Sequence, residues 1–213
     1  MGLMAKDRGD GQTFDPIPEK IHHGICVAVL DMGTQYNETW DKHIHQVLIT
    51  WELPDERIMI QRDGGEIEDK PRWISKFFTL SLHEKANLRK VLESWRGKSF
   101  TKTELEGFDL KNLLTVNCML QVIHAHKDNK TYANVNAVMP LMGYEKKEAE
   151  NPYLYFSFEE GFDLPEGVPD WITEIIQQSE EWDLHVNPRP QGDVDREGDS
   201  DYVPPPIDDD IPF

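Results

Sequence analysis

The chain has 213 residues, of which 38% are hydrophobic and six are Trp, so it is long enough for one sizeable core but short for two full domains. No apolar run approaches the length of a membrane span, and the first dozen residues lack the apolar stretch of a secretory signal, so we expect a cytoplasmic protein. Cys26 and Cys118 lack metal-ligand spacing and are predicted to be small buried residues in a reducing compartment. No metal or cofactor is expected.

The formal net charge of −18 argues against a nucleic-acid partner, but this charge is unevenly distributed. Residues 1–142 hold 18 Lys and Arg against 20 Asp and Glu, residues 143–182 hold 2 against 11, and residues 183–213 hold 2 against 9. Residues 70–102 form a basic segment. A charge run is as often a solvated helix face, but aromatic residues lie among these cations, as they do where single-stranded nucleic acid is bound.

Strand patterns fill the first part of the chain. Residues 21–33 are mostly apolar with β-branched residues, and residues 45–53 alternate as a half-buried strand does. The core-facing set of the second strand is Val47, Ile49, Trp51 and Leu53. An Asp63-Gly64-Gly65 turn then predicts a hairpin, and residues 73–82 predict a further strand. The alternation does not decide which face of this last strand meets the core.

A helix is predicted after that strand. Ser81 and Glu84 form a capping-box pattern, apolar residues recur at helical spacing from Leu88 to Trp95, and Gly97 supplies a C-terminal stop.

The remaining elements follow the same rules. Thr101 and Glu104 repeat the capping pattern for a shorter helix, and residues 118–141 predict two strands around a turn at residues 127–130. One more helix is predicted over residues 170–182, with an apolar stripe along it. This stripe consists of Trp171, Ile172, Ile175, Ile176 and Trp182.

Five strands with a helix between the third and the fourth predict a mainly β chain with an OB-fold, a partly open Greek-key barrel whose strand 2 and 3 face commonly binds oligonucleotides. Other small barrels and sandwiches are compatible with the same order. We expect four parts: a flexible N-terminus at 1–13, an OB-fold single-stranded DNA-binding domain at 14–142, an acidic extension with a helix at 143–182, and a disordered acidic tail at 183–213.

An OB-fold would place certain aromatic and basic side chains beside a bound strand. Stacking of a base on an aromatic ring is worth about 1–3 kcal/mol and tolerates any base sequence. The stacking candidates are Trp73, Phe77 and Tyr132, and the phosphate-contact candidates are Arg72, Lys76, Lys127 and Lys130. Core packing is an equally good interpretation of the three aromatic candidates, and it is the one adopted for Trp51, Phe78 and Trp95.

The last six residues, DDDIPF, are similar to the acidic tip of bacterial single-stranded DNA-binding proteins. The resemblance implies a partner-binding role for Asp208, Asp209, Asp210, Ile211, Pro212 and Phe213. In such a tip, Phe213 and its carboxylate enter an apolar pocket with a basic rim on the partner. Pro restricts the free peptide and the carboxylates steer association, which agrees with this role.

The body resembles single-stranded DNA-binding proteins of tailed phages. Between Phe14 and Trp182 the resemblance is carried by FDPIPEKIHHGICVAV, ISKFFTLSLHEKANLRKVLESWRGK, FDLKNLL and NPYLYFSFEEG. It implies a non-catalytic protein that coats single strands in phage replication and recombination, in the cytoplasm of an infected bacterial host. The tip would recruit replication, recombination or repair proteins of the phage or the host.

The body does not resemble the bacterial proteins, so their tetramer is not carried over, and a homo-oligomer and the choice between DNA and RNA stay open. An acidic tail tethered beside a basic groove competes for it. We therefore expect deletion of residues 183–213 to tighten DNA binding at low salt.

Two other classes of function are an enzyme and an acidic interaction protein. An enzyme is not expected, because the sequence has no phosphate-binding loop, nucleophile elbow or metal-spaced His or Cys cluster. Three Asp at 208–210 on a disordered end cannot hold the geometry of a Mg²⁺ site. The alternative that stays open is an acidic interaction adaptor or DNA mimic that does not itself bind nucleic acid.

Overall fold

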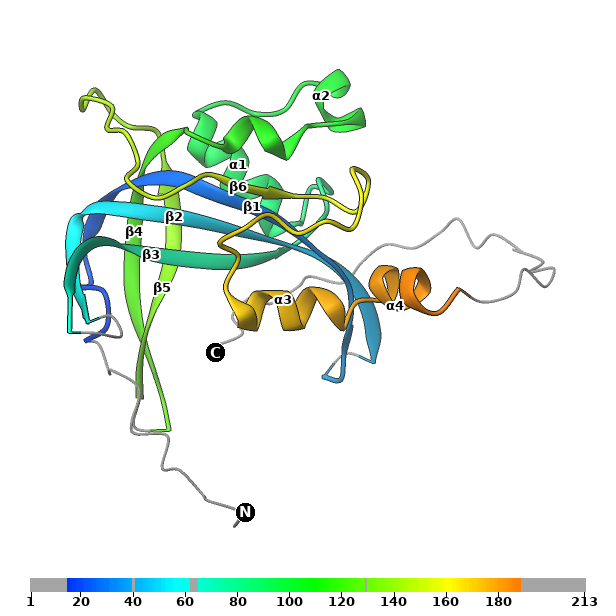
Figure 1. Cartoon of the computed structure of the whole chain (residues 1–213). Coiled ribbons are helices and arrows are strands. Elements are labelled where there is room, and N and C mark those ends of the chain that lie inside the picture. The colour runs from blue at the N-terminus through cyan, green and yellow to red at the C-terminus, as the bar shows by residue number, and fades with distance from the viewer. Residues whose placement is uncertain (1–14, 40, 62–64, 129, 189–213) are drawn as a thin grey trace, which may run out of the picture.

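The computed structural model describes residues 15–39, 41–61, 65–128 and 130–188. Five strands form one antiparallel sheet in the order β3-β2-β1-β4-β5, and its two ends approach each other to give a nearly closed barrel (Figure 1). The strands are β1 (Ile21–Asn37), β2 (Lys42–Gln61), β3 (Ile67–Thr79), β4 (Asn117–Lys127) and β5 (Lys130–Met139). With a helix between β3 and β4, this is an OB-fold, and the predicted fold class is confirmed.

The strands are longer than the sequence indicates. The predicted hairpin is formed by the far ends of β2 and β3, which pair down to Gln61 and Ile67, and its turn lies outside the described residues. The turn between β4 and β5 falls where it was predicted, with Lys127 opposite Lys130. A bulge opposite Val122 shifts the side-chain alternation of β5, so that Val135 and Val138 are the buried residues of that strand.

Helix α1 (Asn87–Arg96) closes one end of the barrel. Its residues Leu88, Leu92 and Trp95 are buried, and it ends at Gly97, whose φ of 66° is the left-handed conformation that glycine adopts without strain. The predicted capping box at Ser81 is wrong, since the N-cap is Ala86 and has no side-chain cap bond. Ser81 instead accepts a hydrogen bond from the backbone N–H of His83, a local turn that competes with capping.

The second predicted capping box is confirmed in α2 (Lys102–Glu106), where the Thr101 and Glu104 side chains accept reciprocal backbone bonds. A 3₁₀-helix, η1 (Leu110–Leu113), leads from α2 into β4.

The barrel interior is filled from all five strands and from α1. Val47, Ile49, Trp51 and Leu53 all point inward as predicted, and the Trp51 and Trp95 rings lie 5.8 Å apart between centroids. Phe78 is also buried, so Trp51, Phe78 and Trp95 are core residues.

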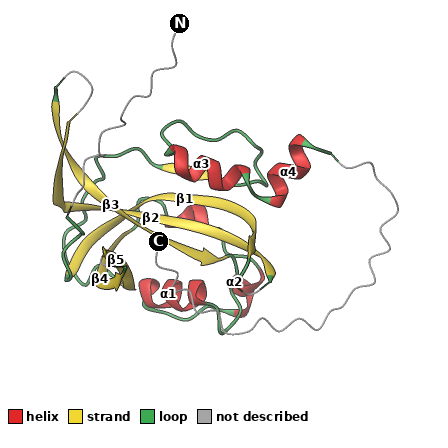
Figure 2. Ribbon diagram, turned by 90° about the horizontal axis from the view of Figure 1, so that it is seen from below, coloured by secondary structure: helices red, strands yellow, loops and turns green. Residues whose placement is uncertain are grey.

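A second apolar layer covers the outer face of β1 and β2, on the side opposite α1 (Figures 1 and 2). It is built by β6 (Leu154–Phe156), which pairs in parallel with β1, and by α3 (Asp170–Gln177) and α4 (Glu180–Val186). Leu48, Thr50 and Glu52 on the outer face of β2 are therefore buried, and the prediction of a half-buried strand is wrong. The acidic extension is what covers this face.

The single helix predicted over residues 170–182 is two helices. Helix α3 ends at Gln177, and the Ser179 hydroxyl caps α4 by accepting from the backbone N–H of Trp182. Ser179 is buried against Gly33 of β1, which fixes the break. Helical structure also continues past the predicted boundary at 182 to Val186, and the rest of the predicted tail, from residue 189, lies outside the described residues. No helix in the described part of the chain is long and apolar enough to span a membrane.

Glu52 anchors the extension to the barrel. This fully buried carboxylate accepts hydrogen bonds from the backbone N–H groups of Glu150 and Asn151 and from the Asn151 side-chain amide, at 2.7–3.0 Å. A buried charge is tolerated when its oxygens are satisfied in this way.

We expect Glu52→Gln to lower the free energy of unfolding by about 1–3 kcal/mol, because the new amide turns a donor toward N–H groups that need an acceptor. Chemical denaturation measures the difference. The matched control is Glu148→Gln, an exposed carboxylate of the same segment, which should change the free energy of unfolding by less than about 0.5 kcal/mol. Equal stability of the two variants would contradict this role of Glu52.

Candidate nucleic-acid interface

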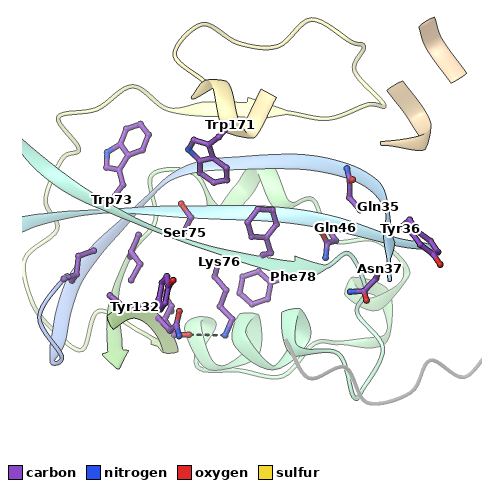
Figure 3. A pocket seen from close by; sticks show the side chains of 16 residues that line it. Gln35, Tyr36, Asn37, Gln46, Trp73, Ser75, Lys76, Phe78, Tyr132 and Trp171 are labelled. Atoms are coloured by element: carbon purple, nitrogen blue, oxygen red, sulfur yellow. Dashed lines mark hydrogen bonds between the residues drawn. The ribbon is translucent and has the colours of Figure 1, made fainter. Parts of the chain in front are cut away.

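A groove of about 660 Å³ runs along the seam between β3 and β5, the two edge strands of the barrel (Figure 3). Side chains from β1, β2, β3, β5 and the start of α3 line it. Four of the seven predicted nucleic-acid contacts lie in this lining: Trp73, Lys76, Phe77 and Tyr132. They come from strands more than fifty residues apart in the sequence, so the fold brings them together.

Side chains from both faces of β3 line the groove. Ile74 and Phe78 turn into the barrel interior, whereas Trp73 and Phe77 turn to the outer face, where they pack against the second apolar layer. Both outer rings are only partly buried. The two interpretations of these aromatics therefore combine, because both side chains pack against the layer and also line the groove.

Lys76 links the two edge strands. Its Nζ donates a hydrogen bond of 3.1 Å to the carbonyl oxygen of Val135 on β5, which joins β3 to β5 across the seam. The ammonium group has three N–H donors, and this bond uses one of them. Lys76 can therefore hold the seam and still donate to a ligand in the groove.

Two other predicted phosphate contacts lie at the end of the β4–β5 hairpin. Lys127 and Lys130 are exposed and pair directly across the hairpin, which places them on the same face as Tyr132, two residues along β5. Like charges directly opposite each other destabilise a hairpin. A bound anion would offset that repulsion, although neither lysine is part of the groove lining. Arg72 also lies outside the lining.

The basic segment at 70–102 does not form one surface. Arg89 and Arg96 are paired with Glu93 and Glu104, and none of the cations from Lys85 onward lines the groove. The local excess of positive charge is therefore divided between β3 and the helical side of the barrel.

Two aromatic side chains of the groove were not among the contacts predicted from the sequence. Tyr36, at the end of β1, is 54% exposed, and Trp171, at the start of α3, is 48% exposed. The apolar stripe predicted over residues 170–182 includes Trp171, but Ile172 and Ile176 form the buried face of α3 and Trp171 lies at its border. Helical spacing shows which face of a helix is apolar, but it does not show how far burial extends around the helix. The sequence therefore could not predict that Trp171 is exposed.

A polar network holds α4 against β1 near one end of the groove. Glu181 accepts hydrogen bonds of 2.6 Å from both the backbone N–H and the hydroxyl of Thr34. His45 lies between two carboxylates, with Nε2 at 2.6 Å from Asp31 and Nδ1 at 3.7 Å from Glu181. The hydrogen bond to Asp31 raises the pKa of His45 above its ordinary value, and the charges of Asp31, Glu181 and Glu159 act in the same direction.

Within the described residues, no group of three or more His, Cys, Asp or Glu side chains is arranged to hold a metal ion. Cys26 and Cys118 are free and buried, and burial raises the pKa of both thiols. The six residues of the predicted partner-binding tip lie outside the described part of the chain.

No model of a known protein family matches this chain, and a search of curated proteins found no relative. The functional argument therefore depends on the groove and on the residues that line it.

We expect the stability of the docked extension to depend on pH through His45. Its folded-state pKa lies above the ordinary value of about 6.5, so its contribution is complete below about pH 6.5 and is lost as pH rises through the raised pKa. Thermal denaturation should show a larger Tm difference between wild type and His45→Gln at about pH 5.5 than at about pH 8.5. The control is His126→Gln, an exposed histidine whose Tm difference from wild type should not change with pH. A Tm difference for His45→Gln that is equally constant would contradict the role of His45.

Proposed function

We propose that this protein is a non-catalytic, sequence-independent single-stranded DNA-binding protein that holds the strand in the groove between β3 and β5. The observation that carries the proposal is the meeting of Trp73, Phe77 and Tyr132 with Lys76 in one open groove of an OB-fold. Aromatic platforms beside cations are the features by which OB-folds bind single strands without reading their sequence.

The energetics favour an unpaired strand over a duplex. Each base that stacks on an aromatic ring gains about 1–3 kcal/mol, and duplex bases are already stacked on one another and do not present their faces. Phosphate contacts from Lys76, Lys127 and Lys130 would add an electrostatic contribution to the binding free energy, and this contribution weakens as the salt concentration rises. The barrel strands themselves are close to neutral, because residues 1–142 hold 18 Lys and Arg against 20 Asp and Glu and the other 20 Asp and Glu lie at residues 143–213.

Recruitment is the second part of the proposal. The DDDIPF tip would bind replication, recombination or repair proteins of a phage or its bacterial host, while the barrel holds DNA. Carboxylates steer such a peptide to a basic surface, and the terminal Phe supplies most of its apolar area. The alternative is an acidic adaptor or DNA mimic, which predicts no binding to either single-stranded or double-stranded DNA.

Binding is tested by fluorescence anisotropy with labelled single strands and with a duplex of the same sequence. We expect single strands to bind more tightly than the duplex, with little dependence on base sequence and a steep loss of affinity as salt increases. Equal binding to the two forms would contradict the proposal, and absence of binding to both forms would contradict it and favour the adaptor.

The stacking roles are tested by Trp73→Ala and Tyr132→Ala. Each should weaken binding to single strands by about 1–3 kcal/mol, the value of one stacked base. Tyr153→Ala is the matched control, because Tyr153 is 43% exposed and does not line the groove. Circular dichroism melts should accompany the titrations, so that a loss of affinity is assigned only to folded variants. Unchanged affinity of folded Trp73→Ala would remove its stacking role.

Competition by the tail is tested by deletion. Because α4 continues to Val186, the deletion should begin at residue 189, so that the helix is kept. We expect the shortened protein to bind single strands more tightly at low salt, and the difference to vanish as salt screens the charges. Superimposable salt titrations of the two proteins would contradict the competition.

A further inference from the structure

We infer that one unpaired base inserts between the indole rings of Trp73 and Trp171, so that α3 of the acidic extension forms one wall of the binding site. The inference rests on the proposed function, and it assigns to the extension a role in binding DNA in addition to covering the barrel.

The two indoles face a common space. Figure 3 shows Trp73 on β3 and Trp171 on α3 projecting to the same side of the sheet, with Ser75 between them. Among the described residues, neither indole is in ring contact with another aromatic side chain. A Trp that is 48% exposed beside a second partly buried Trp gains its stacking partner only when a ligand enters.

Ser75 provides the floor of this space. It is the smallest side chain of β3 between the two large outer rings, Trp73 and Phe77, and it is exposed. Its hydroxyl shares a 2.8 Å hydrogen bond with the Thr50 hydroxyl of β2, which fixes its position. The slot therefore has aromatic walls and a small polar floor, a shape that accepts a flat heteroaromatic ring.

The Trp171 wall is held in place without a ligand. Ile172 and Ile176, on the buried face of α3, are packed into the second apolar layer. Gln35 of β1 donates a 2.9 Å hydrogen bond to the carbonyl oxygen of Ile175, which ties the end of α3 to the barrel. A wall that is already ordered reduces the entropy cost of binding.

Charge determines which part of the strand faces α3. The helix carries Asp170 and Glu174 and no basic residue, so it repels phosphate groups and accepts uncharged bases. The free cations near the groove lie on the other side, at Lys127 and Lys130 of the β4–β5 hairpin. The strand is therefore oriented with its bases toward α3 and its phosphates toward the hairpin.

The test uses the full chain and anisotropy titrations of a labelled oligothymidylate. We expect Trp171→Ala to weaken binding by about 5-fold or more, the equivalent of one lost stacking contact, and Trp171→Phe to keep most of the affinity. The matched control is Leu184→Ala on α4, since Leu184 is also 48% exposed and does not line the groove. It should bind as the wild type does.

A double-mutant cycle decides whether the two indoles share one base. If they do, the fold loss of the Trp73→Ala, Trp171→Ala double variant is well below the product of the two single losses, because either single change already opens the slot. A double loss equal to that product places the indoles on separate bases and overturns the slot. Wild-type affinity of Trp171→Ala also overturns the slot. If Trp73→Ala still weakens binding in that case, the proposed function stands without the slot. Absence of binding by the wild type would instead overturn both.

Discussion

The open seam between β3 and β5 is the constraint on which the rest of the structure depends. In the described sheet these two strands are its ends and share no hydrogen-bonded ladder, so both present edge groups that a closed barrel would pair. The Lys76 side chain satisfies one of these groups, the carbonyl oxygen of Val135, and holds the edges close. The same separation leaves the groove. If β3 and β5 were fully paired, the barrel would be more closed. The groove between them, in which a DNA strand could lie, would then be absent.

The second apolar layer forms one side of the groove. The barrel interior, closed by α1, would form a core without the extension, but the outer faces of β1 and β2 carry Leu30, Met32 and Leu48, which need a cover. Helix α3 and β6 supply it. Glu52 of β2 accepts hydrogen bonds from the backbone N–H groups of residues 150 and 151, and Glu181 of α4 accepts one from Thr34 of β1, so both ends of the extension are tied to the barrel. Trp73 and Phe77 lie at the border of this cover, so they pack against it and also line the groove. The acidic extension is thus part of the folded body and contributes one side of the groove.

The fold class could be predicted because the order of strands and helices follows from local periodicity, and four groove residues could be predicted because an OB-fold brings β3 and β5 together. Alternation in β2 gave the inward residues Val47 to Leu53 correctly, and the helix between β3 and β4 fell where an OB-fold has it. Most of the errors depend on contacts between segments distant in sequence, and the capping box at Ser81 is the exception, because a local turn competes with it. The burial of Glu52 needs residues 150 and 151, and the break between α3 and α4 needs Gly33 beside Ser179. The exposure of Trp171 depends on how α3 docks, which no periodicity within eight residues specifies.

The central claim, that single strands lie in the seam, is tested most directly by mapping contacts rather than affinities. Ultraviolet cross-linking of the full chain to a single strand that carries photoreactive pyrimidines, followed by mass spectrometry, identifies the peptides that touch the bases. The account predicts cross-links in the peptides of β3 that contain Trp73 and Phe77 and in the β5 peptide with Tyr132. Cross-links confined to the cationic helical side, at residues 85–102, would contradict it.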